Sequence, residues 1–498
     1  MLANIPSATL LGVDGHRVNV EVHVSSGLPG YTVVGLPDAA GRESRERVRA
    51  ALLSSGMSWP LKRTTVNLSP ATVRKTGAGL ELAIALGLLV SESELPEDCV
   101  AGVGVLGELG LDGTIRPVPG VLVLADALFR VGIETIIVPP ANAHEAALVA
   151  GLTVRSAPDL ATLRACLKGE EPWPDPDPPP APTDEQDAEP MDLAEVRGLV
   201  TARLALEIAA AGGHHLLLTG PPGCGKTMLA RRLQTILPPL DPDEALEATR
   251  VSSVCDGEPP HELASARPFR APHHTSTTPA LVGGGAGRPR PGEVSRAHRG
   301  VLFLDELGEF PPIALNALRQ PLEEGVVRIA RQGASLVFPA SVLLVACTNP
   351  CPCGRIAADC RCSEAQKARY ARRLSAPLLD RFDLRQRISG PTAHDRPGEA
   401  SATVAARVAD AVARQRHRFL GSPWRWNREI PASLMEHYAA MSSDGLDAWM
   451  LAMEDGMLTG RGAGRVRRVA RTVADLAGAP VVDGEHIVLA ASLRQDVS

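Results

Sequence analysis

Aromatic side chains are scarce in this sequence, and long apolar runs are absent from it. Phe, Trp and Tyr together make up 3% of the residues, so stacking on nucleic-acid bases is not expected to be the main mode of any DNA contact. No apolar run reaches the ~18 residues of a membrane span. The N-terminus has no basic segment followed by an apolar core, as a secretory signal would. We therefore expect a cytoplasmic protein without a membrane partner.

A strong excess of charge of one sign is also missing. The 51 basic and 57 acidic residues leave a net charge of −6, which argues against a protein that coats nucleic acid with a uniformly basic surface. Local groups of Arg and Lys would have to make any contact with backbone phosphates. The hydrophobic content of 44% with 22% charged residues is typical of a soluble globular protein, and the length allows about three domains.

Residues 169–190 separate two parts of the chain. The segment holds eight prolines and eight acidic residues but no Lys or Arg, so it cannot bury a core and is predicted to be an extended linker. Before it, residues 1–168 alternate strand-like runs with helical patterns, which predicts one α/β domain. The expected strands are Val18 to Val24, Thr64 to Leu68 and Thr135 to Val138.

The pattern after the linker is that of a parallel α/β nucleotide-binding sheet followed by helices. Residues 191–392 contain a helical pattern over Leu193 to Ala211 and three apolar runs that suit buried strands, at Leu216 to Leu218, Val301 to Leu304 and Val342 to Ala346. Strand signals stop after about residue 390. A small helical lid is expected over residues 393–498, with helices at 400–420, 431–455, 464–477 and 484–494.

A phosphate-binding loop follows the first of these strands. The sequence GPPGCGKT matches G-x-x-x-x-G-K-[ST] between a strand and a helix, where glycines let backbone N–H groups surround a phosphate chain. Lys226 would reach the β- and γ-phosphates and Thr227 would hold Mg²⁺. A Gly-rich turn with a chance Lys is the disfavoured alternative. The expected ATP- and Mg²⁺-binding residues here are Gly220, Pro221, Pro222, Gly223, Cys224, Gly225, Lys226, Thr227 and Met228.

Two carboxylates end the next strand, VLFL. Carboxyl ends of parallel strands form the edge at which such sheets bind ligands. Asp305 would hold Mg²⁺ through water, and Glu306 would polarise the attacking water as a general base. The alternative is that both residues only cap the following segment.

Three further polar residues are candidates for the same reaction. Asn349 follows the third strand and could orient the lytic water or contact the γ-phosphate, although an Asn before Pro is often a plain turn residue. Arg381, in LLDRFDL, could stabilise the charge of phosphoryl transfer on a neighbouring subunit, or could form a surface pair with Asp380. Arg461 opens a lid helix and is a weaker candidate, because several other arginines lie near it.

Four of the nine cysteines lie between residues 351 and 362. Cys351, Cys353, Cys360 and Cys362 form two C-x-C pairs, and four thiolates satisfy a tetrahedral structural Zn²⁺. The C-x-C spacing is tighter than the C-x₂-C of zinc ribbons. Reduced loop cysteines and a redox-sensitive disulfide therefore remain alternatives.

Taken together, GPPGCGKT, VLFLDE, CTNP and LLDRFDL resemble the magnesium-chelatase-related AAA+ ATPases, and the likeness is closest to the ComM/YifB family. It extends from IPSATLLGVDGHRVNV at the start to GRVRRVARTVADLAG near the end. The resemblance implies an α/β fold class with three parts. These are an N-terminal domain similar to Lon protease (ribosomal S5 domain 2-like), a P-loop AAA+ core with a parallel sheet, and a C-terminal helical lid.

Three positions depart from the patterns that this resemblance suggests. The places of the Lon nucleophilic Ser and its Lys align with Gly79 and Leu122, so the Ser–Lys dyad is missing and an ATP-dependent protease is disfavoured. Family members often carry a Gln after Val-x-Gly before the phosphate loop, whereas here Leu199 follows Val196-Arg197-Gly198. An adenine contact by that side chain is not expected.

The family likeness implies a homo-hexameric ring that uses ATP and Mg²⁺, with Arg381 acting across the subunit interface. It also implies a DNA helicase that drives branch migration in natural transformation on single-stranded or branched DNA. Basic loops could contact the DNA backbone, with a solvated surface charge as the alternative for each arginine; the candidates are Arg288, Arg290, Arg328 and Arg331. A non-motor chelatase-type ATPase that remodels a protein partner is the rival interpretation.

Overall fold

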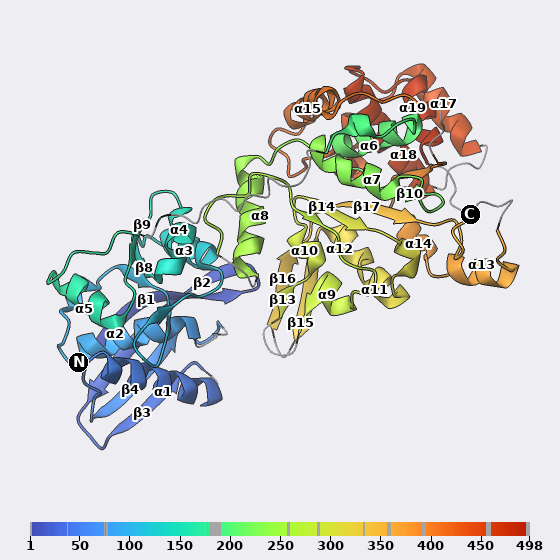
Figure 1. Ribbon diagram of the computed structural model, residues 1–498. Helices are drawn as coiled ribbons and strands as arrows, with labels where there is room; N and C mark the ends of the chain where they lie inside the picture. The colour runs from blue at the N-terminus through green and yellow to red at the C-terminus, as the bar shows by residue number, and fades with distance from the viewer. Residues whose placement is uncertain are drawn as a thin grey trace. The chain divides into compact units, whose positions relative to one another are not determined.

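The computed structural model describes residues 2–36, 38–73, 75, 78–176, 178, 191–255, 259–285, 289–331, 334–355, 360–390, 395–454 and 460–494, with only the backbone given at 38–39, 78, 331, 334 and 460–461. The chain forms two compact units (Figure 1). The first consists of Met1–Thr183, Ala245–Ala264 and Arg328–Phe338, and the second of Asp184–Glu244, Ser265–Val327 and Pro339–Ser498.

A four-stranded sheet in the order β1-β2-β4-β3 forms one part of the first unit. Strands β2 and β4 alternate buried and more exposed side chains, which is the pattern of strands with one face on a core, whereas Ile5 to Leu10 of β1 are buried without a break. The strands are β1 (Leu2–Leu11), β2 (Asp14–Ser25), β3 (Gly30–Val34) and β4 (Arg63–Ser69), and only the β3–β4 pair is parallel. A parallel sheet β5-β8-β9 (Val103–Val105, Thr135–Val138, Thr153–Ser156) and the pair β6–β7 (Glu108–Leu109, Ile115–Arg116) complete the strands.

Helix α2 (Glu81–Ser91) lies at the centre of this unit, and every one of its residues is buried. Full burial of each Leu, Ile or Val side chain contributes about 1.5–3 kcal/mol. Gly87 lets the helix approach the sheet, because a Cβ there would lie 2.5 Å from the Cγ2 of Val22. The other helices are α1 (Asp38–Ser54), α3 (Val121–Phe129), α4 (Ala143–Ala147) and α5 (Leu160–Lys168).

Two segments from later in the chain join the first unit. Most of helix α8 (Pro242–Val254) belongs to it, and Val254 lies in the same apolar cluster as residues of α3 and α4. The hairpin of β15 (Val326–Arg331) and β16 (Ala334–Pro339) contributes Arg328–Phe338. Of the expected linker, residues 177 and 179–190 lie outside the described residues, whereas Trp173 packs against the unit's core and stacks under Arg155.

The second unit contains a five-stranded parallel sheet in the order β11-β14-β17-β10-β18. Its middle strands β14 (Val301–Leu304), β17 (Leu343–Thr348) and β10 (Leu216–Thr219) are buried at every position. Continuous apolar strands of this kind are covered on both faces. Short strands β11 (Phe269–Arg270) and β18 (Leu384–Arg387) form the edges, and β12 (Gly283–Gly284) pairs separately with β13 (Arg290–Pro291).

Along the chain, the helices of the second unit come before, between and after the strands of this sheet (Figure 1). Helix α6 packs against β10 and β18, and it shares an apolar cluster with the C-terminal helices. The helices are α6 (Val200–Gly212), α7 (Lys226–Arg231), α9 (Thr278–Val282), α10 (Glu293–Arg296), α11 (Pro312–Ala317), α12 (Arg319–Glu324), α13 (Glu364–Ala371), α14 (Ala376–Leu379), α15 (Ser401–Arg418), α16 (Met435–Tyr438), α17 (Ser443–Glu454), α18 (Gly460–Leu476) and α19 (Gly484–Ser492).

The α/β class, the parallel sheet and the helical C-terminal region are as predicted, but two expected helices are broken. The helix predicted over 193–211 begins only at Val200, because Gly198 and Leu199 adopt left-handed backbone conformations with φ of 61° and 50°. The helix predicted over 431–455 is interrupted at Met441, which forms a β-bridge with Val482. Among the helices of the described residues, none is both long and apolar enough to cross a membrane.

Candidate ATP-hydrolysis site

The loop after β10 has the geometry that a phosphate-binding loop requires. Gly223 and Gly225 have φ of 76° and 89°, a left-handed region that other residues enter at a cost of about 1 kcal/mol. Gly220 admits the backbone that directly follows β18, since a Cβ there would collide with the carbonyl oxygen of Ile388. Cys224 is buried, and α7 begins directly at Lys226.

The Lys226 ammonium group ties this loop to the end of β17. Its Nζ donates to the carbonyl oxygens of Gly220 and Pro221 at 2.7 and 2.8 Å and to the Oδ1 of Asn349 at 3.2 Å. Lys226 is 9% exposed. The amide predicted from the third strand therefore lies beside the lysine predicted from the loop.

A hydroxyl and a carboxylate meet at the adjoining strand end. The Oγ1 of Thr227 donates to the Oδ2 of Asp305 at 2.7 Å, and the Oδ1 of Asp305 accepts from the backbone N–H of Glu306 at 2.9 Å. Hydroxyl and carboxylate oxygens are the ligands that Mg²⁺ prefers in proteins. The residues present thus fit a nucleotide with its magnesium ion.

Glu306 is held in an unusual backbone conformation with its side chain in solvent. Its φ of 51° is left-handed, and the side chain is 54% exposed. The Oε2 of Glu306 lies 3.2 Å from the Nδ1 of His274, and the ring of His273 stacks on that of His274 at 4.1 Å. Strained non-glycine residues of this kind occur at active sites more often than elsewhere.

His274 is a candidate site residue that the sequence did not single out. It lies in APHHT, between β11 and α9. The adjacent pair His273-His274 in a loop directly after a short strand was the one available signal. A histidine in a loop is ordinary by itself, and its contact with Glu306 depends on the pairing of β11 with β14.

Comparison with known proteins places these residues in a family. Family models described as magnesium chelatase subunit ChlI match residues 20–142, 192–395 and 398–494. The chain is 40% identical to the protein YifB of Escherichia coli over 99% of this chain and 97% of the relative, and 39% identical to the competence protein ComM of Haemophilus influenzae over the same shares. The chain belongs to the ComM/YifB family of magnesium-chelatase-like AAA+ ATPases. A local match to Lon protease 2 of Bacillus subtilis is 32% identical over 27% of this chain and 26% of that protein.

In this AAA+ protein the three positions that depart from the patterns are structural. Leu122 is buried in α3, and its backbone N–H donates to the Oε1 of Glu145 at 3.1 Å. Gly79 belongs to the short turn before α2. Neither residue offers a nucleophile or a base. Leu199 lies against the phosphate loop, with its Cδ1 3.8 Å from the Cβ position of Gly225, so it presents an apolar surface there.

Arg381 pairs within the chain with Glu323, and not with Asp380, the alternative that the sequence offered to a role at a neighbouring subunit. The surface pair with Asp380 is not formed: Arg381 is nine-tenths buried and pairs with Glu323, while the Oδ1 of Asp380 lies 3.6 Å from Arg385 and 3.5 Å from Arg494. The Nε of Arg381 has no hydrogen-bond partner among the described residues. Glu323 is 66% exposed, so the pair sits at the surface.

Lid arginines secure the segment that carries Arg381. Arg465 donates to the Oδ1 of Asp383 at 2.6 Å and to the carbonyl oxygen of Arg381 at 3.3 Å. Burial alone would raise the pKa of Asp383, but the His214 ring, whose Nδ1 lies 3.7 Å from the Oδ2 of Asp383, and the charge of Arg465 hold it well below its usual range. Arg467, Arg468 and Arg471 also have intramolecular partners. The side chain of Arg461, the predicted lid arginine, lies outside the described residues.

The four clustered cysteines converge. Their sulfur atoms all lie within 4.8 Å of one another, and the Sγ of Cys351 is 3.2 Å from that of Cys353 and 3.6 Å from that of Cys360. A tetrahedral zinc site with Zn–S bonds of about 2.3 Å separates its sulfurs by about 3.8 Å. Backbone donation from Arg355 lowers the pKa of Cys353 to about 6, whereas burial raises that of Cys351 to about 12. The four residues, Cys362 included, fit a thiolate metal site.

The structure describes the side chains of two of the four arginines predicted to contact DNA. Arg290 in β13 and Arg328 in β15 are exposed. Arg288 lies outside the described residues, and Arg331 ends β15 with only its backbone described. Their role stays a prediction.

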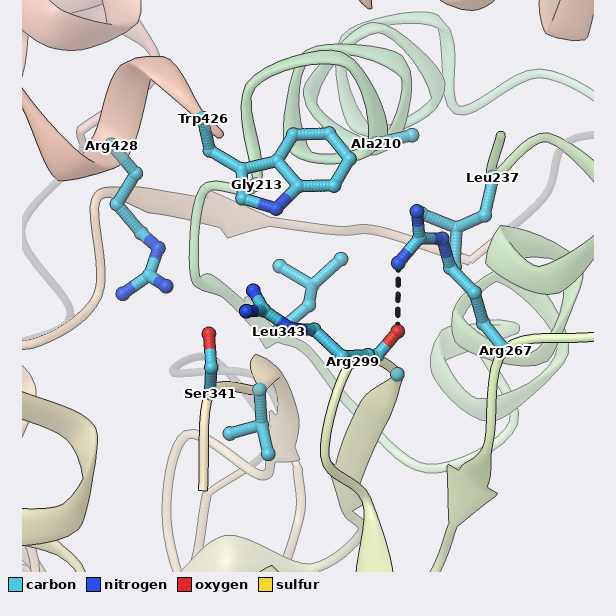
Figure 2. A pocket seen from close by; sticks show the side chains of 11 residues that line it. Ala210, Gly213, Leu237, Arg267, Arg299, Ser341, Leu343, Trp426 and Arg428 are labelled. Atoms are coloured by element: carbon cyan, nitrogen blue, oxygen red, sulfur yellow. Dashed lines mark hydrogen bonds between the residues drawn. The ribbon is translucent and has the colours of Figure 1, made fainter. Parts of the chain in front are cut away.

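Figure 2 shows a small pocket. It lies at the edge of the sheet opposite the candidate ATP site. Gly300 and Leu343, which line it, stand at the beginnings of β14 and β17, whereas Asp305 and Asn349 follow the ends of those parallel strands. Arg267 crosses the pocket to donate to the carbonyl oxygen of Arg299 at 2.7 Å. A cavity of about 30 Å³ is too small for a nucleotide.

Proposed function

We propose that this ATPase is a homo-hexameric motor that acts on single-stranded or branched DNA and promotes branch migration, as a helicase, in natural transformation and recombination. A place of action in the cytoplasm belongs to the same proposal. The similarity along nearly the full length to a relative named a competence protein supports the DNA partner most directly. The exposed Arg290 and Arg328 offer charges for backbone contacts.

The contacts of Lys226 and Thr227 support the division of roles within the ATP site. Lys226 would bind the β- and γ-phosphates, exchanging its present carbonyl and amide partners for phosphate oxygens. Thr227 and Asp305 would hold Mg²⁺, which neutralises charge on the phosphates. The loop from Gly220 to Met228 would supply backbone N–H donors.

Glu306 and Asn349 would act on the attacking water. The Glu306 carboxylate reaches solvent and can accept the proton of that water as a general base. Asn349, which now accepts from Lys226, would orient the water or contact the γ-phosphate.

Arg381 would supply positive charge to the γ-phosphate of a neighbouring subunit. For this it must exchange Glu323 for the phosphate. Such an exchange would make hydrolysis depend on ring assembly. Arg461, in the first turn of α18, would approach the nucleotide from the lid.

We also propose that Cys351, Cys353, Cys360 and Cys362 bind a structural Zn²⁺. The mutual distances of the four sulfurs support this over an isolated disulfide. All protein ligands of such a site are thiolates, so no position is left open for a substrate.

A synthetic four-way junction tests the motor. The wild-type protein should convert the junction to duplex products only with ATP, and Arg290→Ala with Arg328→Ala should weaken DNA binding and flatten its salt dependence. Arg49→Ala, which changes an exposed arginine of α1, is the matched control. If the junction is bound equally by all variants and never resolved, the rival becomes preferable: a non-motor ATPase resembling the magnesium chelatase subunit whose family model the chain matches.

A further inference from the structure

The cysteine cluster lies next to the residues that hold the phosphate loop. Asn349 directly follows β17 and accepts from Lys226, and Cys351 follows it after a single proline. Cys351 is 5% exposed, and its carbonyl oxygen accepts from the backbone N–H of Gly354 at 3.0 Å. The first two thiols thus stand on a tight turn that begins at the ATP site.

That turn packs directly against the phosphate loop. Gly354 is buried with φ of 70°, and a Cβ placed on it would lie 2.6 Å from the Cγ and 2.7 Å from the Cδ of Pro222. Real Cβ atoms do not approach other carbons this closely. Only glycine allows the turn to touch Pro222, and a methyl group at this position would push the two loops apart.

The second pair of cysteines, Cys360 and Cys362, lies directly before helix α13, which contacts residues at the end of β17 and just after β14. After Cys362, Ser363 caps α13 in a capping box. Tyr370 of α13 is buried with its hydroxyl 3.4 Å from the Oγ1 of Thr348, and it leaves no room for a side chain at Gly308, two residues after Glu306. Arg373 then donates to the carbonyl oxygen of Gly308 at 2.9 Å.

Apolar burial does little to hold the turn 351–354 and α13 in place. Between residues 351 and 371, Cys351 and Tyr370 are the buried apolar residues of the described part. A loop with so little buried surface needs another source of order. In small zinc domains the free energy of metal binding itself supplies the free energy of folding.

We propose that a metal ion bound by the four thiolates, Zn²⁺ first among the soft divalent ions, clamps the turn 351–354 and α13 against the phosphate loop and so sets the rate of ATP turnover. The metal takes no part in the chemistry. This inference rests on the proposed zinc and ATP sites. It adds that metal binding at the first site controls ATP turnover at the second.

Gly354→Ala separates the clamp from the metal, because it leaves all four thiols in place. Gly421→Ala is the matched control: Gly421 also has a left-handed φ, of 78°, but nothing lies within 4 Å of its Cβ position. For both full-length variants and the wild type we would measure zinc per chain by mass spectrometry, binding of a fluorescent ATP analogue, and ATPase kcat and KM. Melting curves would establish that each variant is folded.

We expect about one zinc per chain in all three proteins, with kcat/KM of Gly354→Ala lowered about tenfold to a hundredfold, as displacement of a positioning group by about 1 Å does. Gly421→Ala should match the wild type. Removal of zinc with a selective chelator in excess Mg²⁺ should cause a similar loss, open the 351–362 segment to protease, and be reversed by added zinc.

Three results would overturn the clamp. A wild-type chain without bound metal removes its basis. Zinc that can be withdrawn without change in kcat/KM, or a Gly354→Ala variant with wild-type kinetics, would show a metal site independent of the ATP site. None of these results bears on the DNA motor, since no DNA is present in these assays. Conversely, an ATPase rate that depends on zinc but, in a separate assay, does not respond to DNA would reject the motor and leave the clamp standing.

Discussion

The Nδ1 of His274 lies 3.2 Å from the Oε2 of Glu306, the carboxylate that we propose as the general base. The two residues come from loops after neighbouring parallel strands, β11 and β14. A half-exposed histidine in this position limits the directions in which the carboxylate can point. The contact therefore connects the orientation of the base to the loop between β11 and α9.

His274→Ala should lower kcat about tenfold with little change in KM, because it removes orientation of the base without touching the phosphate loop. Steady-state ATPase kinetics measure this. The double variant with Glu306→Gln should be no slower than Glu306→Gln alone, since both changes act through one group. Independent, multiplying losses would contradict a role for His274 through Glu306.

Glu306→Gln should retain ATP binding and lose turnover by about a hundredfold or more, the usual contribution of a general base. Glu309→Gln is the control. It changes a glutamate three positions later whose pair with Arg373 is half-exposed and contributes at most about 1 kcal/mol. Near-normal turnover in Glu306→Gln would exclude it as the base.

Arg381→Ala should bind ATP and fail to hydrolyse it. If Arg381 acts on a neighbouring subunit, mixing this variant with Glu306→Gln should restore activity, because mixed rings contain interfaces with both an intact base and an intact arginine. ATPase rates over a series of mixing ratios measure the rescue. No recovery at any ratio would refute the arrangement across subunits.

Asp383→Asn should destabilise the fold by about 3–5 kcal/mol at neutral pH, because it leaves Arg465 without its buried partner. The pKa of Asp383 is held below its usual range. Its stabilisation is therefore complete above the unfolded-state pKa of about 3.9 and is lost as the pH falls through the lower folded-state value. The gap in melting temperature between the two proteins should therefore stay constant from pH 7 to about pH 5 and begin to narrow near pH 4, and a gap that is unchanged at pH 3 would contradict this.

Much of the site could be predicted from local sequence because its residues follow directly from strand ends. The apolar runs before Gly220, Asp305 and Asn349 fix three buried parallel strands, and the carboxyl ends of such strands meet at one edge. The contacts of Lys226 with Asn349 and of Thr227 with Asp305 follow from that arrangement.

Contacts that depend on tertiary packing could not be predicted in this way. Strand β18 reads LRQR, without an apolar run, and is recognised only by its pairing with β10. Arg381 meets Glu323 from a helix 58 residues earlier in the chain. The break at Met441 requires Val482 from a distant loop. No local pattern encodes any of these partners.

The most direct test of the DNA motor is the ATPase rate of the full-length protein with and without single-stranded and four-way-junction DNA, with Lys226→Ala as the blank. We predict that DNA stimulates hydrolysis and that the stimulation vanishes in Lys226→Ala. A rate indifferent to both DNAs, in a preparation that forms rings, would contradict the motor and leave a protein-remodelling ATPase.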